Sequence, residues 1–269
     1  MIPVSTISPS RFLRARPHRR AHGTVFLPKE HGSWSLALEP ITLGLLAAPS
    51  LAGAALGLAG FAGFLARRPV RAIAQGSGGR DTWIAAGLLI GCGLAAFVCS
   101  ARLVSPAMLA RLLVLAPGAI LFVICDIQGE SRAASAELAG SATFALLPFV
   151  LASFAGESTA SAISLTLLAL ARSLPTVIMV RWYLRWQKGQ ATPRLAPLLA
   201  GLGGLALTIL LAALRLVPWL AVSGASLLWI RTGWWLSSRR PRWSARRIGV
   251  TEALLGVAYT TLVVLAYRS

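Results

Sequence analysis

The chain has 269 residues, of which 56% are hydrophobic and 13% are charged, and its formal net charge is +18. A soluble domain carries about 25% charged residues, so this composition excludes an ordinary soluble protein and indicates one embedded in a bilayer. Nucleic-acid-binding proteins are also strongly basic, but here most Lys and Arg lie in short blocks between apolar runs. That distribution favours a positive-inside membrane topology, with no nucleic acid as partner.

Residues 1–28 form a basic arm that holds Arg11, Arg14, Arg16, Arg19 and Arg20. No apolar segment follows these charges until about residue 33, so the arm does not have the pattern of a cleaved signal peptide. We expect a disordered cytosolic arm that is attracted to anionic lipid headgroups, followed by a transmembrane helical domain over residues 29–269.

Nine apolar runs follow the arm, each near the roughly 20 residues that cross about 30 Å of hydrocarbon. Pro49 and Ser50 leave almost no loop between the first two, which form either two spans or one broken, re-entrant segment. The fold class predicted is all-α, a polytopic membrane bundle of about nine transmembrane helices. The spans cover approximately residues 33–49, 51–66, 82–101, 107–125, 136–154, 159–180, 195–214, 217–236 and 248–267.

The basic residues between the spans set the orientation. They gather in the arm and in the segments that follow spans two, four, six and eight, for example at Arg67, Arg132, Arg181 and Arg239. Because such residues stay on the cytosolic side, we expect a multi-pass protein of a plasma (inner) membrane. Its amino terminus would be cytoplasmic and its carboxy terminus outside.

Two charged residues lie inside predicted spans next to a proline. Glu39 precedes Pro40 in span one, and Arg172 precedes Pro175 in span six. A charge at the centre of a span costs about 2.5–3.5 kcal/mol on translocon scales, so such a residue is a functional-site candidate. We predict that Glu39 and Arg172 form an intramembrane ion pair. The alternative is that each snorkels separately to the cytosolic interface.

Most carboxylates lie near the predicted cytosolic side, which indicates either a polar vestibule or neutralisation of the crowded arginines. If the stretch is helical throughout, Asp126, Glu130 and Glu137 share one helix face at 100° per residue. Their partner would be a cation from another cytosolic segment or a divalent ion with oxygen ligands. The acids on this side are Glu30, Glu39, Asp81, Asp126, Glu130, Glu137 and Glu252.

Arg181 and Arg185 are four residues apart and share a helix face. Together with Arg67, Arg68 and Arg71 they are candidates for a clamp around a phosphorylated or otherwise anionic headgroup. Positive-inside topology alone is the other explanation of the same residues.

Several segments carry a family resemblance. They are PKEHGSW at 28–34, EPITLG in span one, FLARRPVR at 64–71, ESRAASAELAG at 130–140 and ARSLPTVIMVRWYLR at 171–185. Together they resemble the YwiC-like family of bacterial membrane proteins over most of the chain beyond the arm. The resemblance implies a membrane protein but no particular activity.

The architecture also resembles that of the UbiA prenyltransferase superfamily, whose members bind a prenyl diphosphate through magnesium held by Asp-rich motifs. Those motifs follow spans two and six, where this chain has only Asp81 and no acid, respectively. Magnesium is therefore a candidate cofactor without its usual motifs, and no metal-ligand set is predicted.

The leading hypothesis is a protein that binds an isoprenoid or lipid-phosphate ligand in a cytosolic-facing cavity, with prenyl transfer as its enzymatic form. The anionic head would be held by Lys29, Arg67, Arg68, Arg71, Arg181 and Arg185. The cavity would be shaped by Glu30, His31, Glu39, Glu137 and Arg172, with His31 as a proton carrier. Further ligand-binding candidates are Trp34, Asp126 and Glu130.

Two other classes stay open: a small-solute or proton-coupled transporter, and a non-catalytic assembly or docking protein. A ligand binder should have a cavity lined by Glu39 and Arg172, whereas a docking protein should have a filled core.

Overall fold

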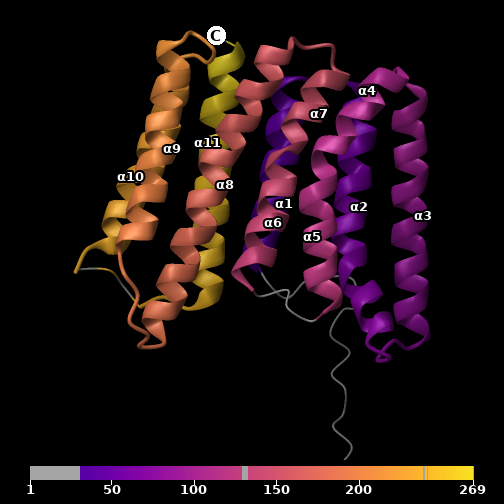
Figure 1. Ribbon diagram of the computed structural model, residues 1–269, viewed down its shortest axis with the longest axis horizontal. Coiled ribbons are helices and arrows are strands. Elements are labelled where there is room, and N and C mark those ends of the chain that lie inside the picture. Colours follow the sequence, from indigo (N-terminus) through magenta and orange to yellow (C-terminus); the bar gives the residue numbers. More distant parts are fainter. Residues whose placement is uncertain (1–30, 129–132, 239, 241, 269) are drawn as a thin grey trace, which may run out of the picture.

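The computed structural model describes residues 31–128, 133–238, 240 and 242–268, and within them every regular element is a helix (Figure 1). The elements are α1 (His31–Ala47), α2 (Leu51–Ala74), α3 (Arg80–Arg102), α4 (Pro106–Ala110), the 3-10 helix η1 (Arg111–Leu115), α5 (Ala116–Ile127), α6 (Ala134–Ala145), α7 (Leu147–Phe154), α8 (Thr159–Gln187), α9 (Leu195–Ala213), α10 (Leu220–Leu236) and α11 (Ala245–Arg268).

In the described part of the chain these helices cross the bundle nine times, because α4, η1 and α5 form one pass and α6 with α7 forms another. Six segments are long and apolar enough to cross a membrane: α3, Pro106–Cys125, Ala134–Phe154, α8, α9 and α11. Helices α1 and α10 are shorter, at 17 residues each. The predicted all-α membrane bundle is confirmed, and the protein is a multi-pass membrane protein.

Helix ends follow from local sequence. Ser50 caps α2, since its Oγ accepts a hydrogen bond from the Gly53 N–H at 2.9 Å. Residues 33–66 therefore form two helices and not one broken segment. Pro148 lies in the first turn of α7, and its missing N–H interrupts the hydrogen-bond ladder where α6 gives way to α7.

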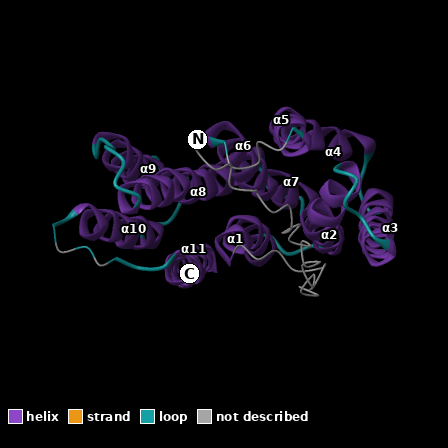
Figure 2. Cartoon of the chain, turned by 90° about the horizontal axis from the view of Figure 1, so that it is seen from below, coloured by secondary structure: helices purple, strands orange, loops and turns teal. Residues whose placement is uncertain are grey.

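The helices pack in two layers (Figure 2). One layer holds α10, α11, α1, α2 and α3, and the other holds α9, α8, α6 with α7, and α5 with α4. Helix α8 is central, since 61% of its most apolar window is buried, against 17% for α3 and 6% for Pro106–Cys125. The exposed apolar side chains of α3 and α5 are suited to contact with lipid.

We call the end of the bundle where α1 begins the basic end; α2, α5, α8 and α10 finish there (Figure 1). Helix α5 finishes at Ile127 and α6 starts at Ala134, after Ala133 in an extended conformation. Asp126 and Glu137 therefore lie on two different, mutually packed helices. The condition for one acidic helix face is therefore not met for Asp126 and Glu137, and Glu130 lies outside the described residues.

Candidate functional site

Four charged side chains from four helices meet inside the bundle. Glu39 lies on α1, Arg172 on α8, Arg231 on α10 and Glu252 on α11, and we call them the four-charge cluster. Their side chains are 12%, 3%, 5% and 4% exposed, respectively. At 1.5 Å per residue, Glu39, Arg231 and Glu252 lie about 7–12 Å from the basic ends of their helices.

Arg172 joins the two carboxylates. Its Nε lies 3.2 Å from Glu39 Oε2, an ion pair without hydrogen-bond geometry, and its Nη2 donates to Glu39 Oε1 at 3.3 Å. On the other side, Nη1 donates to Glu252 Oε2 at 3.2 Å, and Nη2 donates to the Glu252 backbone carbonyl at 2.8 Å. The predicted Glu39–Arg172 pair is confirmed, as part of a larger cluster.

Arg231 completes the cluster from α10. Its Nη2 lies 3.4 Å from Glu252 Oε2 and donates to Thr176 Oγ1 at 3.0 Å. Thr176 also accepts a hydrogen bond from Arg172 Nη1. The Arg231 guanidinium lies over the Trp235 ring, 5.6 Å from its centroid. Both this cation–π contact and the ion pair with Glu252 therefore hold the guanidinium in place.

The cluster is electrically balanced, with two guanidinium groups and two carboxylates. Removing such ions from water costs several kcal/mol each, which only mutual pairing offsets. Pairing is nevertheless incomplete within the described residues: Arg231 Nε and Nη1 and Glu252 Oε1 are buried without a hydrogen-bond partner. These atoms retain capacity to bind a further group.

Glycine makes room for Glu39. A Cβ at Gly256 of α11 would lie 2.7 Å from Glu39 Oε2 and would overlap Oε1 and Cδ. Ser35, one turn earlier on α1, donates its hydroxyl to Glu39 Oε1. The Glu39 carboxylate is therefore held between its own helix, the α11 backbone and Arg172.

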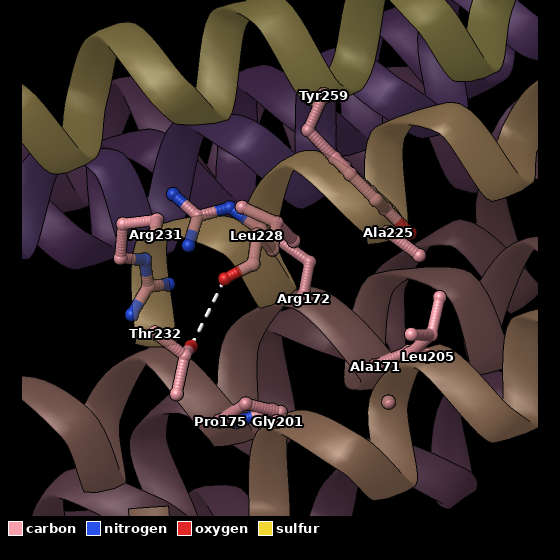
Figure 3. A pocket seen from close by; sticks show the side chains of 11 residues that line it. Ala171, Arg172, Pro175, Gly201, Leu205, Ala225, Leu228, Arg231, Thr232 and Tyr259 are labelled. Carbon is pink, nitrogen blue, oxygen red and sulfur yellow. Dashed lines mark hydrogen bonds between the residues drawn. The ribbon is translucent and has the colours of Figure 1, made fainter. Parts of the chain in front are cut away.

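A cavity of about 10 Å³ lies beside the arginines, which is room for about one water molecule. It is lined by Arg172 and Arg231 together with Thr232, Tyr259 of α11 and apolar residues of α8, α9 and α10. In Figure 3 both guanidinium groups lie on one side, with Tyr259 and Ala225 on the other. On the α9 side Gly204 packs closely, since a Cβ there would lie 2.7 Å from the Ala171 carbonyl.

Packed aromatic rings separate the cluster from the basic end. Tyr183 and Trp235 are buried in contact with each other, at 5.0 Å between centroids. Arg240 lies 3.9 Å from the Trp186 centroid. Desolvation there, and then the charge of Arg194, lowers the pKa of Arg240. The basic end of α8 and α10 is thus closed by side chains.

Other candidates from the sequence lie closer to the basic end, outside the cluster. Trp34 packs against Phe61 and Phe64 of α2, with centroids 5.9 and 6.1 Å apart. The Arg67 guanidinium lies over the Phe122 ring at 5.3 Å. Arg68 is the next residue on α2. These contacts join α1, α2 and α5.

The arginines of the predicted clamp come from two helices. Arg67, Arg68 and Arg71 lie on α2, whereas Arg181 and Arg185 lie on α8, and α1 packs against both helices (Figure 2). Arg181 pairs instead with Glu137 of α6 at 2.5 Å, and Arg185 Nε donates to Gln190 Oε1 at 3.0 Å. The predicted cation from another segment is therefore Arg181, at least for Glu137.

Five candidates receive little or no structural description. Lys29, Glu30 and Glu130 lie outside the described residues. His31 and Asp126 are described only as backbone positions, at the start of α1 and near the end of α5.

Sequence reasoning missed two members of the cluster. Arg231 lies inside predicted span eight, and Glu252 was counted among the cytosolic acids although it lies inside span nine. The available signal was the one that identified Glu39 and Arg172: an isolated charge within an apolar run.

The comparisons with known proteins bear on the first half of the chain. Residues 27–152 match the family model of YwiC-like proteins. This confirms the resemblance to the YwiC-like family over those residues, which include Glu39. Arg172, Arg231 and Glu252 lie beyond the YwiC-like match. No curated protein and no solved structure matches the chain at a significant level.

Proposed function

We propose that this membrane protein is a proton-coupled transporter of a small solute, with the four-charge cluster as its coupling site. The observation that supports this most is the burial of two arginines and two glutamates, contributed by four helices, inside a membrane-spanning bundle. Ionisable residues in such positions are costly, and they mark ion pathways and proton relays.

Glu39 is the carboxylate that would carry the proton. It is the most exposed member of the cluster, and its cationic partner is Arg172, whereas Glu252 lies against both arginines. When Glu39 takes up a proton, Arg172 stays paired with Glu252. The cluster then survives the change of charge, as a transport cycle requires.

A lipid-phosphate ligand or prenyl transfer has less support. Small-molecule sites usually enclose about 300–1,000 Å³, whereas the cavity lined by Arg172 encloses about 10 Å³. The arginines expected to hold the anionic head come from two helices, α2 and α8. A docking role is consistent with the nearly filled core, since the cavity encloses only about 10 Å³ and is lined by Arg172 but not by Glu39. It would rest on the basic arm, which lies outside the described residues.

For location, we propose the bacterial inner membrane with the basic end in the cytoplasm. The support is the positive-inside rule. Among the described residues, the basic end holds Arg67, Arg181, Arg194 and Arg247 with their neighbours, and the opposite end holds Arg102, Arg111, Arg215 and Arg268. Lipid contact at the basic end would favour anionic headgroups.

The test is solute-driven proton movement in proteoliposomes that contain a pH-sensitive dye. Candidate small anions, amino acids and sugars are added outside, and internal pH is followed. We expect at least one solute to acidify the lumen, and Glu39→Gln to abolish this signal while the purified protein stays monodisperse. Glu137→Gln is the matched control, since Glu137 pairs with Arg181 outside the cluster. Equal proton movement in wild type and Glu39→Gln would refute the proposal.

A further inference from the structure

We infer that the cavity beside Arg172 and Arg231 is a binding site for one small monovalent anion, of about the size of chloride, and that this anion binds together with a proton on Glu39. The inference rests on the proposed function, because it names the substrate class of the same site. It is carried by the chemistry of the cavity wall and by the charge balance of the cluster.

The cavity wall is cationic on one side and apolar on the other. Both arginines line it, whereas no carboxylate does so among the described residues. Arg231 is 5% exposed and keeps Nε and Nη1 without hydrogen-bond partners. The hydroxyl of Thr232 is already used, because it donates to the Leu228 carbonyl at 2.9 Å. The free capacity at this wall therefore consists of guanidinium N–H donors, which favour an anion.

The size of the cavity limits the anion. About 10 Å³ accommodates roughly one water-sized sphere, so a halide, which is larger than water, enters only if the apolar wall shifts outward, and an extended organic anion does not fit. Ala225 and Leu228 of α10 form part of the boundary. A larger side chain at Ala225 would fill the space without touching a charge.

Charge balance couples the anion to a proton. The two arginines and two glutamates sum to zero, so a bound anion leaves one uncompensated negative charge in a medium where such a charge is costly. Protonation of one carboxylate restores neutrality.

Which of the two carboxylates, Glu39 or Glu252, takes up the proton depends on the groups that face Glu39. They are Arg172 of α8, Arg231 of α10, Glu252 and Tyr259 of α11 and the Ser35 hydroxyl of α1. Helices α2, α6 and α7 also pack on α1. Helix α7 contributes no titratable side chain, whereas Arg67 of α2 lies over Phe122 and Glu137 of α6 pairs with Arg181, both closer to the basic end. Glu252 lies against both guanidinium groups, so Glu39 is the group that takes the proton.

The experiment measures the thermal stability of the detergent-purified full chain in sodium chloride and in sodium gluconate at equal ionic strength, from acidic to alkaline pH. Gluconate is the control because it is too large for the cavity. We expect a saturable chloride-specific stabilisation. Above the pH at which Glu39 loses its proton, the apparent affinity should fall about tenfold per pH unit, since only the protonated fraction binds.

Four variants sharpen the test. Arg231→Met removes the anion's donors but leaves Glu252 paired with Arg172, and Ala225→Val fills the cavity. Both should lose the chloride effect. Glu39→Gln mimics the protonated state and should keep chloride binding while losing its pH dependence. Arg247→Met removes an exposed cation from the first turn of α11 and should behave as wild type.

Equal stability in chloride and gluconate would mean that the cavity holds a water only, and would overturn the inference. So would chloride binding that survives Ala225→Val, or wild-type binding that does not vary with pH. Because this measurement needs no transport, it separates the two claims. Proton-linked chloride binding without flux would refute only the proposal that the protein is a transporter. Glu39-dependent flux without chloride binding would refute only the inference that the cavity binds an anion.

Discussion

Replacing Gly256 by alanine tests whether the Glu39 carboxylate is held where the structure places it. The new methyl group would lie 2.7 Å from Oε2 and would overlap Oε1 and Cδ, so the carboxylate has to move. Its contacts to Arg172, at 3.2 and 3.3 Å, leave no room for that displacement without breaking.

The expected magnitude combines two opposing effects. Breaking a buried ion pair costs about 3–5 kcal/mol. Replacing glycine by alanine inside a helix stabilises the helix by about 1 kcal/mol, because alanine has the higher helix propensity. We therefore expect Gly256→Ala to lower the free energy of unfolding by about 2–4 kcal/mol. Gly203→Ala in α9, where a Cβ meets nothing within 4 Å, should raise it by up to about 1 kcal/mol.

The assay is equilibrium unfolding in mixed detergent micelles, followed by tryptophan fluorescence, for both single variants and for Glu39→Ala with and without Gly256→Ala. Once the carboxylate is gone, Gly256→Ala should behave like Gly203→Ala, which gives a clear coupling energy in the double-mutant cycle. A Gly256→Ala variant as stable as wild type, or a cycle with no coupling, would show that Glu39 does not lie against α11.

Three further substitutions should have smaller effects on the free energy of unfolding, measured in the same way. Glu137→Gln should cost at most about 1 kcal/mol, because the Glu137–Arg181 pair is 36% and 28% exposed and such pairs contribute little; a larger loss would mean that the pair is buried. Tyr259→Phe should cost about 0.5–1.5 kcal/mol, since it removes the hydrogen bond from the buried hydroxyl to the Leu168 carbonyl at 2.9 Å; no loss would argue against that bond. Ser100→Ala should cost a similar amount, about 0.5–1.5 kcal/mol, because it removes the hydrogen bond from the Ser100 hydroxyl to the Ala52 carbonyl at 2.8 Å. The same variant should speed amide exchange in α3, and unchanged exchange would contradict a role in joining α2 to α3.

The spans could be predicted because the thickness of the bilayer fixes the length of an apolar run. The broken pass through α4, η1 and α5 was not predicted, although Arg111 at the start of η1 and Pro117 in the first turn of α5 mark its breaks. The end of α2 was also placed too early, at residue 66 and not Ala74, because its arginines continue the helix beyond the apolar run.

The Glu39–Arg172 pair could be predicted because a lone charge within a span requires a partner. The participation of Arg231 and Glu252 depends on which helices are neighbours, here α10 and α11 beside α8 and α1, and helix neighbours are set by packing and not by order in the chain. For the same reason the sequence does not decide whether Arg67 of α2 and Arg181 of α8, which both lie at the basic end, act on one ligand.

The central claim is that Glu39 takes up and releases a proton inside the membrane. Infrared difference spectroscopy of the protein in liposomes tests it most directly, by following the C=O stretch of protonated carboxyl groups as the pH is lowered. The account predicts a band that is present in wild type and in Glu137→Gln and is lost in Glu39→Gln. A spectrum in which Glu39→Gln removes no carboxyl band would show that Glu39 stays ionised throughout and that the four-charge cluster only holds the helices together.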